Sequence, residues 1–185
     1  MKIKITEYTR DNGGMIVIAR DTRDQTGKHK NVDDGLASRG IKTVRTKLYV
    51  GDVARLDDMT VCIDLKKNLS EVYGNVIQQH DRFVRECRRA QQAGIRLIIL
   101  VEQKGIGSVQ DVAAWKNPRI SKWEKLRDAH RNGKRMSERL NPYPPVSSER
   151  LAKAMQTISD RYGAEWMFCT PDKTVNVICE VLRID

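Results

Sequence analysis

Apolar residues recur along the chain with two different periods, and these periods predict an alternation of strands and helices. Short runs that alternate or are apolar throughout are typical of strands, whereas apolar residues three, four and seven positions apart are typical of helices. The predicted strands are Met1–Tyr8, Met15–Arg20, Thr46–Val50, Met59–Lys66, Arg96–Glu102 and Glu165–Thr170. The predicted helices are a short one ending at about Arg39, a long one over Leu69–Ala93, one from Ser147 or Ser148 to about Tyr162, and a terminal one with Pro171 in its first turn.

The connections between these elements indicate how they are arranged. The turn sequence Asp-Asn-Gly-Gly at 11–14 predicts an opening β-hairpin, and the polar stretch Asp21–Asp34 predicts a loop. A strand, a long helix and a second strand follow one another from Met59 to Glu102, and this order predicts a crossover unit with parallel strands. We therefore expect an α/β fold with a mixed central β-sheet flanked by α-helices.

The predicted strand at 59–66 carries two charged residues on one face. Because successive side chains of a strand point to opposite faces, Val61, Ile63 and Leu65 share one face. Asp64 and Lys66 share the other. Burying such charges costs free energy unless they pair with each other or bind a ligand. The two residues are therefore either an exposed pair on a solvated strand or part of a site.

The length of 185 residues is that of one domain with a substantial core. We expect a single domain over 1–185, with a basic insertion at about 103–146 and a C-terminal helix, strand and helix over 147–185. From Lys116 to Arg139, nine Lys or Arg residues stand against three Asp or Glu residues, which gives +6 of the total net charge of +10.

This charge changes the expected partners. A basic excess of this size in a small domain favours polyanions, nucleic acid first and acidic membrane second. Aromatic residues make up only 5% of the chain, which disfavours binding through stacked bases and favours contacts with backbone phosphates.

Other classes of protein are disfavoured. Four cysteines without a CxxC pair, together with only three histidines, disfavour a zinc site, and reduced cysteines are typical of cytosolic proteins. No apolar run has the length of a membrane span, and the N-terminal sequence lacks the apolar core of a signal peptide. We expect a protein without a membrane partner that is not secreted, cytoplasmic in a prokaryotic or phage-infected cell or nuclear in a eukaryote.

The charged strand residues match a known catalytic pattern. Asp64-Leu65-Lys66, preceded by Asp52, has the D…(D/E)xK arrangement of metal-dependent nucleases. Phosphodiester hydrolysis needs a hard divalent cation held by oxygen ligands, which Asp52, Asp64 and the backbone carbonyl of Leu65 can supply. Lys66 would orient or activate the attacking water. The triplet alone is weak, because a DxK sequence arises often by chance on solvated strands.

The first half of the chain contains five short elements in a fixed order. They read IARDTRD at 18–24, LYVGD at 48–52, IDLKKNLSE at 63–71, GNVIQQ at 74–79 and IILVE at 98–102. In their order and spacing they resemble the nuclease domain of the XPF family of structure-specific DNA endonucleases, in the PD-(D/E)xK superfamily. The resemblance implies a restriction-endonuclease-like core for the fold.

The chain also departs from the family pattern. Asp64 stands where the family has Glu, Leu65 where it has Arg, and Asp24 where it has Glu. The family's later Asp falls on Ser70, with Glu71 beside it as a substitute. No tandem helix-hairpin-helix module follows. The chain therefore resembles a compact, stand-alone member of the kind that phages carry.

Carried over by position, the resemblance assigns roles to particular residues. The catalytic set is Asp21, Asp52, Asp64 and Lys66, and the supporting set is Arg23, Glu71 and Gln79. DNA contacts are expected from the long helix through Arg82. Further contacts are expected from the basic segment, as a flexible arm that orders only on binding; its residues are Lys122, Lys125, Arg131, Lys134 and Arg135.

These observations predict a Mg²⁺- or Mn²⁺-dependent DNA endonuclease. Branched or otherwise non-B-form DNA, such as a Holliday junction or a flap formed in recombination, replication or repair, is the expected substrate. The family implies a homodimer, for which the helix Leu151–Tyr162 and the terminal helix are candidate contacts. Two alternatives stay open: a non-catalytic nucleic-acid-binding module with a degenerate nuclease fold, and RNA as the substrate.

Overall fold

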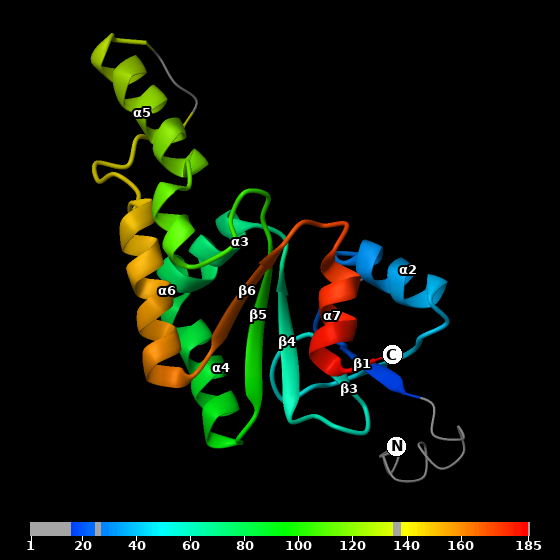
Figure 1. Ribbon diagram of the computed structural model, residues 1–185. Helices are drawn as coiled ribbons and strands as arrows, with labels where there is room; N and C mark the ends of the chain where they lie inside the picture. Colours follow the sequence, from blue (N-terminus) through cyan, green and yellow to red (C-terminus); the bar gives the residue numbers. More distant parts are fainter. Residues whose placement is uncertain (1–15, 25–26, 135–137, 185) are drawn as a thin grey trace.

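A mixed β-sheet forms the centre of the computed structural model, which describes residues 16–24, 27–134 and 138–184 (Figure 1). In this part of the chain, six strands lie in the order β2-β1-β3-β4-β5-β6. β3 runs antiparallel to both of its neighbours, and the other neighbouring strands are parallel. The strands are β1 Val17–Asp21, β2 Lys42–Thr46, β3 Val53–Arg55, β4 Val61–Lys66, β5 Arg96–Glu102 and β6 Glu165–Cys169.

Helices cover both faces of this sheet, which confirms the predicted α/β fold. α4 and α6 lie on one face, and α2 and α7 lie on the other (Figure 1). The helices are α2 Lys30–Ser38, α3 Leu69–Tyr73, α4 His80–Gln92, α5 Pro118–Arg131, α6 Ser148–Tyr162 and α7 Thr174–Leu182. A π-helical turn, η1 (Gly74–Gln78), joins α3 to α4, and a 3₁₀ turn, η2 (Gln110–Ala114), precedes α5.

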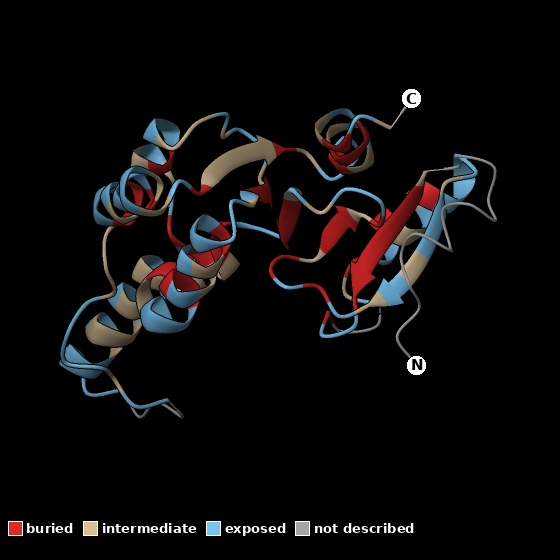
Figure 2. Cartoon of the chain, turned by 90° about the horizontal axis from the view of Figure 1, so that it is seen from below, coloured by how far each residue is buried: buried red, intermediate tan, exposed pale blue. Residues whose placement is uncertain are grey.

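Two apolar clusters fill the space between the sheet and these helices. On β4, Cys62 faces the α4 and α6 side, whereas Ile63 and Leu65 face α2 and α7. Buried residues lie along β1, β3, β4 and β5 and on the helix faces turned toward the sheet (Figure 2). The predicted alternation of β4 is therefore confirmed, and it places Asp64 and Lys66 on the α4 side of the sheet.

Several predicted elements match closely. β5 has the predicted bounds, and it pairs in parallel with β4 as the crossover unit requires. The predicted strand at 165–170 forms as β6, and α6 begins after Ser147, whose side chain caps it, and ends at Gly163 with φ 68°. All four cysteines are buried and free. No helix among the described residues has the length and apolar character needed to cross a bilayer.

The prediction was wrong around β2 and β3. The strand predicted at 46–50 lies earlier in the sequence, as β2, which pairs with β1 up to Thr46. Beyond Thr46 the chain leaves β1, and the backbone N–H of Leu48 donates to the Asp21 carboxylate instead (2.8 Å). β3 is only three residues long and was not predicted. The predicted opening strand Met1–Tyr8, and with it the hairpin, lies outside the described residues.

Three helices also differ from the prediction. α2 begins at Lys30, inside the predicted loop, because Val32 and Leu36 lie one turn apart and pack against α7. The long predicted helix is interrupted by the π turn η1. Pro171 lies in the turn that precedes α7, not in its first helical turn.

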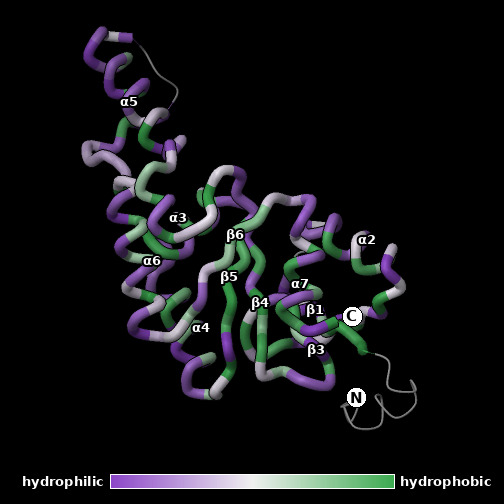
Figure 3. Tube along the Cα trace, viewed as in Figure 1, coloured by the Kyte–Doolittle hydropathy of each residue, from purple (hydrophilic) through white to green (hydrophobic). Residues whose placement is uncertain are grey.

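The basic segment contains a helix, which corrects the expectation that it folds only on binding. Asn117 caps α5 by accepting from the Arg119 N–H (3.0 Å), and Pro118 suits the first helical position. The segment that follows α5 packs along this helix, since Trp123 donates its indole N–H to the Asn141 carbonyl (2.8 Å). α5 projects from the body, buries no residue and is largely hydrophilic (Figures 1 and 3).

Candidate active site

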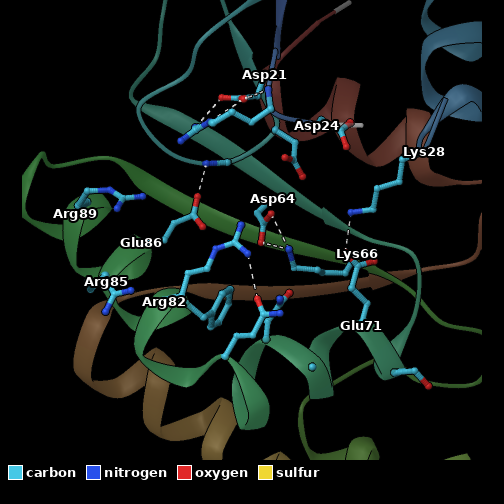
Figure 4. Close-up of a pocket in the computed structure, with 18 of the residues that line it drawn as sticks. Asp21, Asp24, Lys28, Asp64, Lys66, Glu71, Arg82, Arg85, Glu86 and Arg89 are labelled. Carbon is cyan, nitrogen blue, oxygen red and sulfur yellow. Dashed lines mark hydrogen bonds and ion pairs between the residues drawn. The ribbon is translucent and has the colours of Figure 1, made fainter. Parts of the chain in front are cut away.

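A cleft of about 670 Å³ opens between the ends of β1 and β4 and the helices α3 and α4 (Figure 4). Eight residues that the sequence singled out line it together: Asp21, Arg23, Asp52, Asp64, Lys66, Glu71, Gln79 and Arg82. These residues come from five separate stretches of the chain. The fold therefore brings the predicted catalytic and supporting residues to one place.

Asp64 and Lys66 form a buried ion pair at the centre of this cleft. The Lys66 ammonium donates to Asp64 Oδ1 at 2.8 Å and lies 2.7 Å from Oδ2, and the two side chains are 10% and 7% exposed. The interpretation as an exposed pair on a solvated strand is therefore wrong. Asp64 Oδ2 is buried and lies outside hydrogen-bond geometry with any described donor. Burial lowers the pKa of Lys66, but the charges of Asp64 and Asp52 outweigh it and leave the pKa raised.

Asp52 lies beside this pair because β3 and β4 are antiparallel neighbours. Its backbone N–H donates to the Ile63 carbonyl (2.8 Å), and its Oδ2 accepts from the Leu65 N–H (2.9 Å). Burial first, and then the negative charge of Asp64, raise the pKa of Asp52 to about 8. The carboxyl group of Asp52 is thus held in a buried place beside the carboxylate of Asp64.

Oxygen atoms that could serve as metal ligands converge beside Asp52 and Asp64. The N–H and C=O of a strand residue point to the same edge, so the Leu65 carbonyl faces the edge of β4 on which Asp52 lies. Among the described residues, no group of three or more His, Cys, Asp or Glu side chains converges on a metal position. Two carboxylates and a carbonyl nonetheless suit Mg²⁺ or Mn²⁺, since Mg²⁺ is commonly bound by one or two carboxylates together with substrate phosphate.

Asp21 holds the wall of the cleft in place. Its carboxylate accepts from the Arg23 side chain at 2.9 and 2.7 Å, from the Arg23 N–H at 2.6 Å and from the Leu48 N–H at 2.8 Å. Burial raises the pKa of Asp21, but these hydrogen bonds outweigh it and leave the pKa lowered. Both oxygens are engaged, so the geometry favours a positioning role for Asp21.

The supporting residue Glu71 makes both a long-range and a local contact, whereas Gln79 makes a local one. Glu71 accepts from the Lys28 ammonium (2.7 Å) and the Lys67 N–H (3.0 Å). Burial raises the pKa of Glu71, but the Lys28 hydrogen bond and the other contacts outweigh it and leave the pKa lowered. Gln79 accepts from Arg82 (3.1 Å).

The predicted DNA-contacting residues of the basic segment lie outside the cleft. Lys122, Lys125 and Arg131 are exposed on α5, and Lys134 is exposed just beyond its end. Arg135 lies outside the described residues.

The structure also adds cleft residues to which the sequence analysis gave no role. They are Asp24, Lys28, Asn75, Arg85, Glu86, Arg89 and Arg119. The positions of Arg85 and Arg89, three and seven residues beyond Arg82, place them on one helix face and were a usable signal. Arg119 had no such signal, because it reaches the cleft only through tertiary packing.

Comparisons with known proteins agree with this architecture. No protein-family model and no curated protein matches the sequence. Among solved structures, XPF from Aeropyrum pernix is similar, with a TM-score of 0.54, 16% identity and coverage of 91% of this chain and 66% of that one. The same protein in complex with DNA gives a TM-score of 0.56, 18% identity and coverage of 91% and 64%. The chain thus spans slightly less than two thirds of the length of these structures, and its fold is similar to that of XPF.

Proposed function

We propose that the chain is a Mg²⁺- or Mn²⁺-dependent DNA endonuclease that hydrolyses phosphodiester bonds in branched or otherwise non-B-form DNA, such as a junction or flap formed in recombination, replication or repair. The buried Asp64–Lys66 pair beside Asp52, in a cleft of an XPF-like fold, carries this proposal. The similar XPF structure in complex with DNA supports DNA as the partner. A homodimer stays a prediction.

The two carboxylates and the Leu65 carbonyl would hold the cation. When bound there, a divalent cation would polarise the scissile phosphate and would favour hydroxide as the nucleophile. Asp52 Oδ2 already accepts from the Leu65 N–H, so the proton that Asp52 retains near neutral pH sits on Oδ1. Binding of the cation requires release of that proton, because carboxylates bind metals in their charged form.

Lys66 acts as a cation in this proposal. Its raised pKa keeps the ammonium charged at neutral pH, so it cannot accept a proton from water. A charged donor beside Asp64 instead positions the water and stabilises negative charge that develops on the phosphate oxygens. Asp21 and Arg23 contribute by holding the loop that leads from Leu48 to Asp52.

A non-catalytic nucleic-acid-binding module is the second candidate. Two observations favour it: Lys66 is already engaged by Asp64, and no group of three metal-binding side chains occurs among the described residues. This candidate predicts tight, salt-sensitive binding that does not respond to divalent cations.

The test is cleavage of labelled four-way junction, flap and linear duplex DNA, and of matching RNA, with Mg²⁺ or Mn²⁺. Wild type is compared with Asp52→Ala and Lys66→Ala, and the matched controls are Asp58→Ala and Lys67→Ala, which alter exposed charges near the same strand. We expect wild type and both controls to cut branched DNA, and Asp52→Ala and Lys66→Ala to bind without cutting. Binding by wild type without cleavage under either cation would establish the binding module instead.

A further inference from the structure

Three arginines form a row along the cleft-facing side of α4. Arg82, Arg85 and Arg89 all line the cleft, and no carboxylate among the described residues forms a salt bridge with any of them. Three other cleft cations differ, since Arg23, Lys28 and Lys66 each pair with a carboxylate. From the first to the last arginine of the row, the helix rises by roughly 10 Å. Unpaired cations in a cleft attract an anionic ligand.

A second group of cations begins at the opposite side of the cleft. Arg119, in the first turn of α5, lines the cleft and stacks over the Tyr73 ring at 5.0 Å. Its Nε is buried without a hydrogen-bond partner in the described structure. The Tyr73 hydroxyl also accepts from the Val146 N–H (2.8 Å), which anchors the chain returning from α5. The base of α5 is therefore fixed to the cleft, although its far end projects into solvent.

The two groups of cations lie on either side of the proposed catalytic centre. Figure 4 shows Arg85 and Arg89 on one side of Asp64, and Lys28 and Glu71 on the other. Arg119 belongs to the second side, because its partner Tyr73 lies on α3 close to Glu71. α4 leads from the cleft toward one end of the molecule, and α5 projects toward the other (Figure 1).

Building on the proposed function, we propose that DNA crosses the cleft with a divided footprint. The α4 row holds the backbone of the cleaved strand on one side of the cutting position, and Arg119 with the exposed lysines of α5 holds a duplex arm on the other. At about 3.4 Å per nucleotide, the roughly 10 Å row spans about three nucleotides. The 14 residues of α5 span roughly 21 Å, or about six base pairs.

A duplex is the form of DNA that suits α5. Duplex DNA carries one negative charge per about 1.7 Å of axis, twice the density of one of its strands, so a straight row of cations gains more from it. Trp123 is the one Phe, Tyr or Trp residue of α5, and its ring is covered by Arg127 at 5.1 Å. Base stacking on this helix is therefore disfavoured.

The experiment measures binding of a labelled flap junction whose arms are shortened one at a time. Fluorescence anisotropy is recorded in Ca²⁺, so that binding is read without relying on cleavage. Two double variants remove charge from one side each: Arg85→Gln with Arg89→Gln, and Lys122→Gln with Lys125→Gln. Arg88→Gln is the matched control, because Arg88 is on the same helix but stacks on Tyr162 away from the cleft. Glutamine keeps high helix propensity, and circular dichroism verifies the fold of each variant.

Each double variant is expected to weaken binding by about tenfold or more at 0.1 M salt and to lower the salt slope by about 2. The α4 variant should become insensitive to shortening of one arm, and the α5 variant to shortening of a different arm below about six base pairs. The divided footprint would be overturned if both double variants became insensitive to shortening of the same arm. It would also be overturned if Arg88→Gln weakened DNA binding as much as the double variants do. If wild type binds none of the junctions, the proposed function fails as well; wild-type binding without any arm-specific pattern overturns the footprint alone.

Discussion

The Lys66 ammonium lies within 2.8 Å of both carboxylate oxygens of Asp64, and the two side chains leave the same face of β4 with one residue between them. Both are almost fully excluded from solvent. Removing two such charges from water costs several kcal/mol per ion, and their attraction offsets this cost only in part. The buried pair therefore does not indicate that these residues are present to stabilise the fold. It indicates a site that requires a cation and a carboxylate at fixed positions.

This relationship predicts how stability responds when one partner is removed. Lys66→Met leaves the Asp64 carboxylate buried without its partner, and we expect a loss of about 3–5 kcal/mol in the free energy of unfolding. Urea denaturation at pH 7 measures it. The double variant Asp64→Leu with Lys66→Met removes both charges and should recover most of the loss. Lys67→Met, on the exposed neighbour, should cost less than about 0.5 kcal/mol. A Lys66→Met cost as small as that of Lys67→Met would contradict the buried pair.

The carboxyl group of Asp52 predicts a pH-dependent response to divalent cations. Its folded pKa of about 8 lies above the ordinary value of 3.8, so the protein without a cation loses stability from this group as the pH rises through that window. A bound cation favours the charged carboxylate and offsets the loss. We therefore expect Mn²⁺ to raise the melting temperature of wild type more at pH 8 than at pH 6.

Asp52→Asn is the critical variant for this prediction. Without a cation it should be more stable than wild type at pH 8, because position 52 then carries no ionisable group, and Mn²⁺ should leave its melting temperature unchanged. Thermal unfolding followed by circular dichroism at pH 6, 7 and 8 compares the two proteins. A Mn²⁺ response that is equal in wild type and Asp52→Asn would show that the cation binds elsewhere.

Asp21 predicts a pH dependence of the opposite sign. Its folded pKa lies below the ordinary 3.8, so its contribution to stability is present above that pH and is lost as the pH falls through the folded pKa. Asp21→Asn should cost about 2–3 kcal/mol at pH 7, because the hydrogen bonds from Arg23 and Leu48 to a buried charge are weakened. The difference from wild type should shrink below pH 4.

Urea denaturation at pH 7, 5 and 3.5 measures the Asp21 effect. Asp57→Asn provides the control, because Asp57 also accepts from an arginine, Arg55, but its side chain is 35% exposed. Solvent screens such a pair, so this variant should change stability by less than about 1 kcal/mol. If the two variants cost the same at pH 7, Asp21 does not hold the cleft wall in the way that its contacts indicate.

The sequence predicted β4, β5 and the grouping of Asp52, Asp64 and Lys66 because these depend on local pattern. The two-residue period of β4 by itself places Asp64 and Lys66 on one face, and the continuous apolar run of β5 indicates a strand covered on both sides. Asp52 joins them because it immediately precedes β3, which is the neighbour of β4 along the chain as well as in the sheet. The grouping of these residues can thus be predicted, because they lie on segments that follow one another along the chain.

What the sequence did not predict depends on tertiary contacts. β2 ends at Thr46 because a distant carboxylate, that of Asp21, takes the Leu48 N–H. α2 begins early because its apolar residues meet α7, about 140 residues further along the chain. Arg119 enters the cleft only through its stacking on Tyr73. None of these contacts produces a periodic pattern of apolar residues in the nearby sequence.

Gly51 connects the fold of the loop to the position of Asp52, and it gives the last prediction. Its φ is 71°, and a Cβ at this position would lie 3.0 Å from the Ile63 carbonyl oxygen and 3.2 Å from its carbon. These are backbone atoms of β4, so they cannot move aside as a flexible side chain would. The left-handed conformation alone costs an alanine about 1–2 kcal/mol. Gly51→Ala must add the cost of pushing the loop away from β4.

Gly94→Ala separates these two costs. Gly94 has a φ of 65°, and nothing lies within 4 Å of a Cβ placed there, so this variant carries only the conformational cost. We expect urea denaturation to show a loss of about 1–2 kcal/mol for Gly94→Ala and a larger loss for Gly51→Ala. The Gly51 variant should also lose the Mn²⁺ response, because the displaced loop carries the Asp52 carboxylate away from Asp64. Equal losses with an intact Mn²⁺ response would mean that close packing of this loop against β4 does not set the position of Asp52.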